Sequence, residues 1–234
     1  MKGLFRKEWT HLFRTMTGYV FAAMYLALSG AVFTLSNLLS QSGDIKSYFS
    51  VFTTVSVLIC PILTMGSFSE ERKQKTDELL LTAPVSLTSV VISKFLATLS
   101  VFLLPMLVTL AYPALLAAYG ASAPMATLGN YLGLTLLAAA CIAIGQFLSM
   151  LTDSQFVAAM MTYSVFALLL LAGAGATMLS EPAAQKALSF LAIATHCEGF
   201  SYGVFDWTQA VYFISVTALF LFLGVTVLER RRLA

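Results

Sequence analysis

Apolar residues fill six long runs along this chain, and polar residues gather in short segments between them. The runs cover roughly 18–40, 48–68, 86–118, 127–151, 155–179 and 209–229. Each run is about as long as the ~20 residues that a helix needs to cross a hydrocarbon layer of about 30 Å. Strands of a membrane barrel would instead alternate in polarity over about 10 residues. The pattern predicts an all-α membrane protein, a single transmembrane domain over 1–234 with six transmembrane helices.

The third run is longer than a single crossing requires. It contains Pro105 and Pro113, and proline removes a backbone hydrogen bond from the helix interior. We therefore expect this span to be kinked or tilted.

The first seventeen residues form a separate element. At 100° per residue, apolar side chains of residues 2–16 share one face, which is made of Phe5, Trp9, Leu12, Phe13 and Met16. Lys7, His11 and Arg14 lie on the opposite face. We expect residues 1–17 to form an amphipathic helix in the membrane interface, with Trp9 at the depth of the lipid headgroups. A soluble helix that binds a partner is the alternative, but direct attachment to the first span favours the membrane surface.

One connecting segment, residues 69–84, is far more charged than the rest of the chain, of which only 10% is charged. Its charged residues are Glu70, Glu71, Arg72, Lys73, Lys75, Asp77 and Glu78, and it ends with Leu79-Leu80-Leu81 and Pro84. A short helix of this polarity cannot cross a bilayer. We interpret it as a surface that a partner outside the membrane binds.

The composition supports a membrane protein and reduces the classes of partner to be expected. Hydrophobic residues make up 59% of the chain and the mean hydropathy is +0.87, which excludes an ordinary soluble domain. The net charge of +2 gives no reason to expect a nucleic-acid partner. The three cysteines, Cys60, Cys141 and Cys197, form no CxxC pair, so we interpret them as small apolar residues of the core.

The distribution of basic residues predicts the orientation. With six spans, one side of the membrane holds only Lys46 and Lys186, and the other holds the remaining eleven of thirteen Lys and Arg residues. Since cytoplasmic loops are enriched in Lys and Arg, we expect a multi-pass protein of the cell (plasma) membrane with both termini and residues 69–84 in the cytoplasm. Residues 180–208 then lie outside, either as a re-entrant segment or as a plain ordered loop.

No catalytic, cofactor-binding or metal-binding motif occurs in the sequence. It has no phosphate-binding, dinucleotide-binding or HExxH pattern. Among ionisable residues near the spans, we expect Lys94 to extend its side chain to the water and Asp153 to cap the fifth helix. The lack of carboxylates within the spans disfavours an ion-coupled transporter and an intramembrane enzyme. The sequence has membrane spans but no nucleotide-binding motif. We therefore expect the energy for its function to come from another polypeptide.

Three segments carry a resemblance to a known family. They are residues 68–85 (FSEERKQKTDELLLTAPV) with Ile92-Ser-Lys-Phe95, residues 199–206 (GFSYGVFD) with the ending Val227-Leu-Glu-Arg-Arg-Arg232, and Arg6-Lys-Glu-Trp9. They resemble the permease subunits of type-2 ABC exporters, in particular the gliding-motility-associated (Gld-type) branch. Lys75 and Asp77 depart from the family pattern.

The resemblance implies a six-helix permease that pairs with a second permease, identical or different, and binds two cytoplasmic ABC ATPase subunits. Residues 1–17 would be the elbow helix, with Phe5, Trp9, Leu12 and Phe13 in contact with lipid. Residues 69–84 would be the coupling helix that contacts the ATPase, through Glu70, Glu71, Arg72, Lys73, Thr76, Glu78, Leu79, Leu80 and Thr82. ATP and Mg would bind the ATPase subunit, and no cofactor would bind this chain.

The function expected from these features is that of an ABC exporter permease with an unidentified substrate. The alternative is a membrane anchor that recruits a cytoplasmic ATPase for motility, secretion or envelope assembly, with no substrate crossing the membrane.

Overall fold

The computed structural model describes residues 2–75, 86–120, 124–176 and 207–233, and these residues are helical apart from short turns. The helices are α1 (Lys2–Arg14), α2 (Thr17–Phe33) with a π-helical turn (Thr34–Leu38), α3 (Ile45–Thr64), α4 (Ser69–Lys73), α6 (Leu87–Val108), α7 (Ala111–Ala118), α8 (Pro124–Leu151), α9 (Gln155–Ala176) and α12 (Trp207–Leu233). Within these residues there is no strand. The predicted all-α class is confirmed.

Six stretches of the described helices are long and apolar enough to cross a membrane, as predicted. They are Thr17–Leu38, Ile45–Lys73, Leu87–Ala118, Met125–Leu151, Gln155–Gly173 and Trp207–Arg232. The third stretch is broken at Thr109 and Leu110, just after Pro105, which separates α6 from α7. Of the predicted re-entrant segment, residues 180–206 lie outside the described residues, and the last two residues belong to α12.

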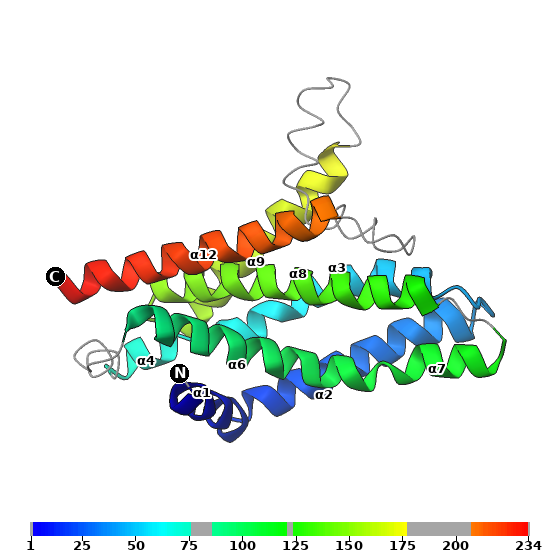
Figure 1. Cartoon of the computed structure of the whole chain (residues 1–234), viewed down its shortest axis with the longest axis horizontal. Coiled ribbons are helices and arrows are strands. Elements are labelled where there is room, and N and C mark those ends of the chain that lie inside the picture. The colour runs from blue at the N-terminus through cyan, green and yellow to red at the C-terminus, as the bar shows by residue number, and fades with distance from the viewer. Residues whose placement is uncertain (1, 76–85, 121–123, 177–206, 234) are drawn as a thin grey trace.

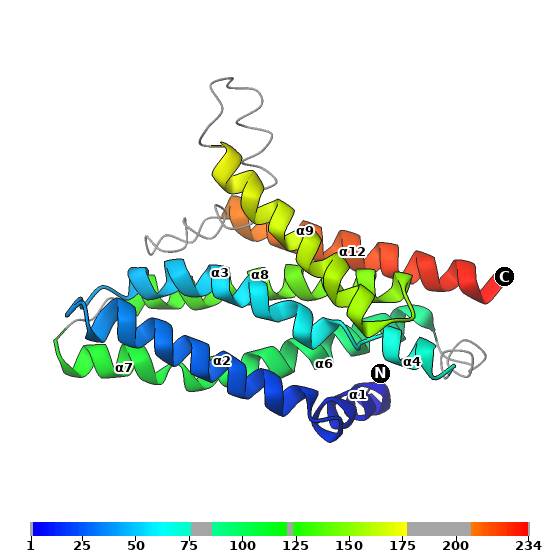
Figure 2. The ribbon, with the colours of Figure 1, turned by 180° about the vertical axis from the view of Figure 1, so that it is seen from behind.

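The spans lie side by side in an elongated bundle, and α4 and both termini lie at the same end (Figures 1 and 2). An even number of crossings requires this arrangement. At the centre, α8 packs against α3, α6, α9 and α12. The short helix α1 lies across the end of the bundle and packs against α6 and α2.

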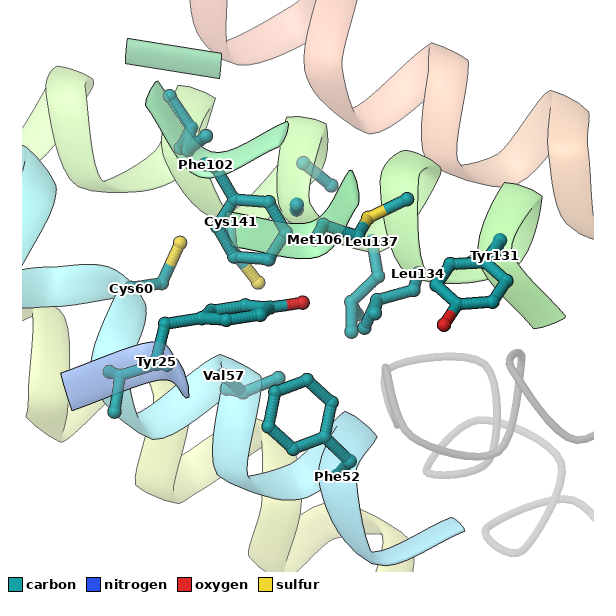
Figure 3. Close-up of a cluster of buried hydrophobic side chains, with 14 of the residues drawn as sticks. Tyr25, Phe52, Val57, Cys60, Phe102, Met106, Tyr131, Leu134, Leu137 and Cys141 are labelled. Atoms are coloured by element: carbon teal, nitrogen blue, oxygen red, sulfur yellow. The ribbon is translucent and has the colours of Figure 1, made fainter. Parts of the chain in front are cut away.

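Aromatic side chains fill the core between α2, α3 and α6. Tyr25 meets the edges of Phe52 and Phe102 at centroid distances of 5.0 and 5.3 Å, and all three are fully buried (Figure 3). Such edge-to-face contacts add about 0.5–1.5 kcal/mol each to the burial of the rings. Cys60 and Cys141 are free thiols within the same core, which agrees with their interpretation as small apolar residues.

The helix α1 departs from the predicted apolar face at its end. Met16 is 71% exposed and has a φ of 60°, in the left-handed region. The predicted place of Met16 on the apolar face is therefore wrong, because α1 ends at Arg14 and the chain turns sharply into α2. Trp9, Leu12 and Phe13 pack against the main core, so this face covers the bundle.

A close approach between α3 and α8 depends on Gly145. A Cβ atom at this position would lie 2.2 Å from Oγ1 and 2.8 Å from Cβ of Thr64, which is fully buried. Only a residue without a side chain lets the two helices meet here, as is common in membrane helix packing.

We expect Gly145→Ala to lower the melting temperature of the purified protein in detergent by about 2–12 °C, because overpacking costs about 1–3 kcal/mol. Gly30→Ala is the matched control, since its Cβ would lie 3.6 Å from Oη of Tyr112, an ordinary contact. Equal melting temperatures for the Gly145→Ala variant and the unsubstituted protein would contradict the close approach.

Candidate functional site

The charged segment begins where α3 ends, and a serine of α8 holds this junction. The chain leaves α3 at Thr64 and passes through a turn over 65–68 into α4. The hydroxyl of Ser149 donates to the carbonyl of Met65 (3.0 Å) and accepts from the backbone N–H groups of Phe68 (3.2 Å) and Ser69 (3.1 Å). Helix ends leave backbone groups without partners. Ser149 satisfies three of them and so fixes α4 to α8.

A buried lysine joins three separate segments beside this junction. Lys94 of α6 is 3% exposed. Its Nζ lies 2.8 Å from Oε2 of Glu8 and 3.1 Å from Oε1 of Glu71, and it donates to the carbonyl of Ser67 at 2.9 Å. The Nζ also lies 5.0 Å from the centroid of the Phe68 ring. One ammonium group thus connects α1, α6 and the start of the charged segment.

The expectation that Lys94 extends to water is wrong. Snorkelling avoids the desolvation of a charge where no partner is available. Here two carboxylates and a carbonyl surround the Nζ, and a charge that is paired and hydrogen-bonded can stay buried. A second lysine, Lys7, lies 3.8 Å from both Glu8 and Glu71, but its side chain is 58% exposed and contributes little.

The next residue of α4 points to a different neighbour. The Nε atom of Arg72 lies 2.6 Å from Oδ1 of Asp153, which is in the turn between α8 and α9. The structure therefore gives Asp153 a role in pairing with α4, in place of the expected helix cap. Arg231 of α12 donates to the carbonyl of Met150 at the end of α8, so α12 is joined to the same region.

A polar side chain deeper in the bundle extends this set of contacts. Gln146 is 1% exposed, and its Nε2 donates to the hydroxyls of Ser67 (3.3 Å) and Thr98 (3.1 Å). Thr98 in turn donates to the carbonyl of Lys94 at 2.9 Å. The turn before α4 is therefore bonded to both α6 and α8.

These contacts divide the described part of the charged segment into two sides. Glu71 and Arg72 face the bundle through their ion pairs, while Lys73, Gln74 and Lys75 are exposed. Glu70 is half-buried and its Oε2 lies near Gly66. The remaining predicted contact residues, which are Thr76, Glu78, Leu79, Leu80 and Thr82, lie outside the described residues.

Glu8 and Lys94 were not predicted from the sequence to be functional partners. A signal was available, because Glu8 borders the apolar arc of α1 on the side of Leu12, and Lys94 interrupts an apolar run. Two opposite charges on apolar faces favour each other as partners, since each would otherwise be buried alone.

The arrangement suits a mechanical role. Among the residues that the structure describes, no group of three or more His, Cys, Asp or Glu side chains could hold a metal ion. What the side chains around α4 form is a set of ion pairs and hydrogen bonds that join α4 and the turn before it to α1, α6, α8 and the α8–α9 turn. We call this set (Glu8, Glu71, Lys94, Arg72, Asp153 and Ser149) the α4 anchor.

The chain matches the model of a known protein family. Residues 27–228 match a family model described as ABC-2 family transporter protein, so the similarity begins within the first span and ends within the last. A search of curated proteins found no match.

Removing the lysine of the α4 anchor should be strongly destabilising. We expect Lys94→Met to lower the melting temperature by about 6 °C or more, because breaking a buried ion pair costs about 3–5 kcal/mol. Adding Glu8→Gln should restore part of this loss, and a double-mutant cycle measures the coupling. The control Lys7→Gln removes an exposed lysine of α1 and should change little. Additive effects of Glu8→Gln and Lys94→Met would show that the two side chains do not interact.

Loss of the serine contact should loosen α4 locally. We expect Ser149→Ala to speed amide hydrogen exchange at Phe68 and Ser69 by about tenfold or more, because both N–H groups lose a buried acceptor. Ser100→Ala is the control, since its hydroxyl bonds only carbonyls of its own helix, those of Leu96 and Ala97. Unchanged exchange at residues 68 and 69 would rule out this function of Ser149.

Proposed function

The chain belongs to the ABC-2 transporter family, and we propose on this basis that it is the permease subunit of an ABC exporter whose ATP is hydrolysed by a separate subunit. Family membership makes it a multi-pass membrane component of an ABC transporter. Outward transport, the separate ATPase chains and the substrate-conducting role are our proposal. The assignment to the gliding-motility-associated branch rests on the resemblance of residues 68–85 and 199–206 and is part of the same proposal.

One observation supports this function most directly. Residues 70–75 combine a side bonded to the bundle with a side exposed beyond it, at the end of the bundle where both termini lie. An element that only ended a span would need no such division. A helix that receives force from a partner needs both a free surface for contact and firm bonds to the spans.

We assign the two sides different roles in coupling. Glu71 and Arg72 hold the segment to the bundle, and Lys73 together with Thr76, Glu78, Leu79, Leu80 and Thr82 contacts the ATPase. Exposed ion pairs contribute about 0–1 kcal/mol each, so the charges mainly set the orientation of the partner. The three leucines supply the apolar anchor of that contact.

The proposed cycle starts when ATP and Mg bind two ATPase subunits in the cytoplasm and draw them together. Each ATPase displaces residues 69–84 of one permease. The displacement passes through the chain to α3, through Glu71 and Lys94 to α6, and through Arg72 and Asp153 to the turn between α8 and α9. The spans of two paired permeases, identical or different, rearrange and expel the substrate, and hydrolysis resets the complex.

The alternative function, a membrane anchor for an ATPase with a mechanical task, would use the same contact. Substrate stimulation distinguishes the two, since only an exporter has ATPase activity that rises when the transported compound is added to reconstituted vesicles. An anchor has no such compound.

The two sides of the charged segment can be tested separately. We expect Lys73→Glu combined with Leu80→Ala to reduce co-purification with the ABC ATPase subunit at least about tenfold, because it reverses an exposed charge and removes an apolar anchor. Glu71→Gln should keep that association and lower the ATPase rate of the reconstituted complex, because it weakens the bond to Lys94.

The control is Lys46→Glu at the other end of the bundle, in the first turn of α3, which should preserve both association and rate. Full association and full ATPase activity of the Lys73→Glu/Leu80→Ala variant would refute the assignment of residues 69–84 as the ATPase contact.

A further inference from the structure

The face of α1 that points away from the bundle is basic. Gly3, Arg6, Lys7, Thr10, His11 and Arg14 line a shallow groove on this face, and all six are exposed. The only carboxylate of α1, Glu8, points the other way and binds Lys94. Within the described residues, neither Arg6 nor Arg14 forms an ion pair. The groove therefore presents positive charge that the rest of α1 does not neutralise.

Beside this groove runs a row of aromatic rings that crosses from α1 to the first span. The centroid distances are 6.0 Å from Phe5 to Trp9, 5.2 Å from Trp9 to Phe13 and 5.2 Å from Phe13 to Tyr19. Tyr19 belongs to the first turn of α2 and is 62% exposed, and Val20 beside it is exposed as well. The row thus ends on the surface of α2, a span, where the surrounding medium is lipid.

The basic groove and the aromatic row both lie where α1 meets the first span. The helix lies across the end of the bundle, and α2 begins three residues after it ends (Figure 1). This is the level at which hydrocarbon gives way to headgroups. Tyr and Trp are enriched at that level, and basic residues there attract anionic lipids.

We propose that the basic groove of α1 binds the headgroup of an anionic phospholipid, with the phosphate between Arg6 and Arg14 and the exposed end of the aromatic row, at Tyr19, against the glycerol and upper acyl chain. Guanidinium groups suit phosphate because they can donate two parallel hydrogen bonds. An acidic groove on a protein partner would also match the charge. It would not explain why the aromatic row continues onto the lipid-facing surface of α2.

This proposal needs neither the ATPase nor the direction of transport, so it can fail while the proposed function stands. The chain has two tryptophans, and Trp207 begins α12 at the opposite end of that helix from Arg230. In a Trp207→Phe variant, Trp9 is the only fluorophore of its kind and lies beside the groove.

The experiment reconstitutes this full-length variant in vesicles of phosphatidylcholine containing increasing fractions of brominated phosphatidylglycerol or brominated phosphatidylcholine. Bromine quenches tryptophan only at short range, so the quenching curves give the relative affinity of the two lipids beside Trp9. We expect phosphatidylglycerol to be preferred by about fivefold or more at low salt, and less at high salt, because each basic residue near the surface adds to the attraction.

Three double variants test whether Arg6 and Arg14 are the residues that bind the lipid headgroup. Arg6→Gln/Arg14→Gln should reduce the preference to about one, whereas Arg6→Lys/Arg14→Lys should keep most of it because the charge remains. The matched control Arg230→Gln/Arg232→Gln removes two exposed arginines from α12 at the same end of the bundle and should keep the full preference. Melting curves verify that each variant is folded.

Two outcomes would overturn the proposal. One is equal quenching by both lipids in the folded Trp207→Phe protein. The other is an equal loss of preference in the Arg6→Gln/Arg14→Gln and Arg230→Gln/Arg232→Gln variants, which would indicate general surface charge. If the lipids quench equally and Arg6→Gln/Arg14→Gln instead weakens binding of the ATPase subunit, the basic groove serves a protein partner.

Discussion

A positive charge buried in an apolar bundle must find negative partners, and Lys94 imposes this requirement on three segments at once. An ammonium group without partners would cost several kcal/mol at this depth. Glu8 from α1 and Glu71 from α4 meet the requirement, with the carbonyl of Ser67 as a further acceptor. The orientation of α1 across the bundle and the direction of α4 both follow from it, since each helix must bring one carboxylate to the same nitrogen.

Close packing of α8 against α3 is the second feature that positions α4. Gly145 lets α8 approach α3 at Thr64, the last residue of α3. Ser149, one turn further along α8, then reaches the backbone of residues 65–69. Gly145 and the hydroxyl of Ser149 thus join α8 to the end of α3 through close packing and hydrogen bonds. The inward side of α4 is fixed to the bundle, and its outward side is left exposed.

The sequence predicted the spans well, because the requirement for apolar helices of about 20 residues is local and depends on no partner. It could not predict the ion pairs of Lys94 and Asp153. These depend on how far each helix is rotated about its own axis, and that rotation is set by contacts between distant residues such as Gly145 and Thr64.

Met16 was placed on the wrong face for a related reason. Helical periodicity gives no warning of where a helix ends, and only the left-handed turn into α2 shows that α1 has already stopped. The charged segment was recognised from composition alone, but its division into bonded and exposed sides required the neighbouring helices.

The separation of Glu8 and Lys94 along the chain has a consequence for biosynthesis. The two residues are 86 positions apart, and a ribosome needs roughly 4–17 s to add that many residues at about 5–20 per second. The first two spans and Glu71 are made within this interval, and Glu8 stays without Lys94 until its end. The end of the bundle can close only when the third span enters the membrane. A chain that stalls or inserts this span incorrectly leaves Glu8 and Glu71 without their buried lysine, which distinguishes an unfinished protein from a mature one.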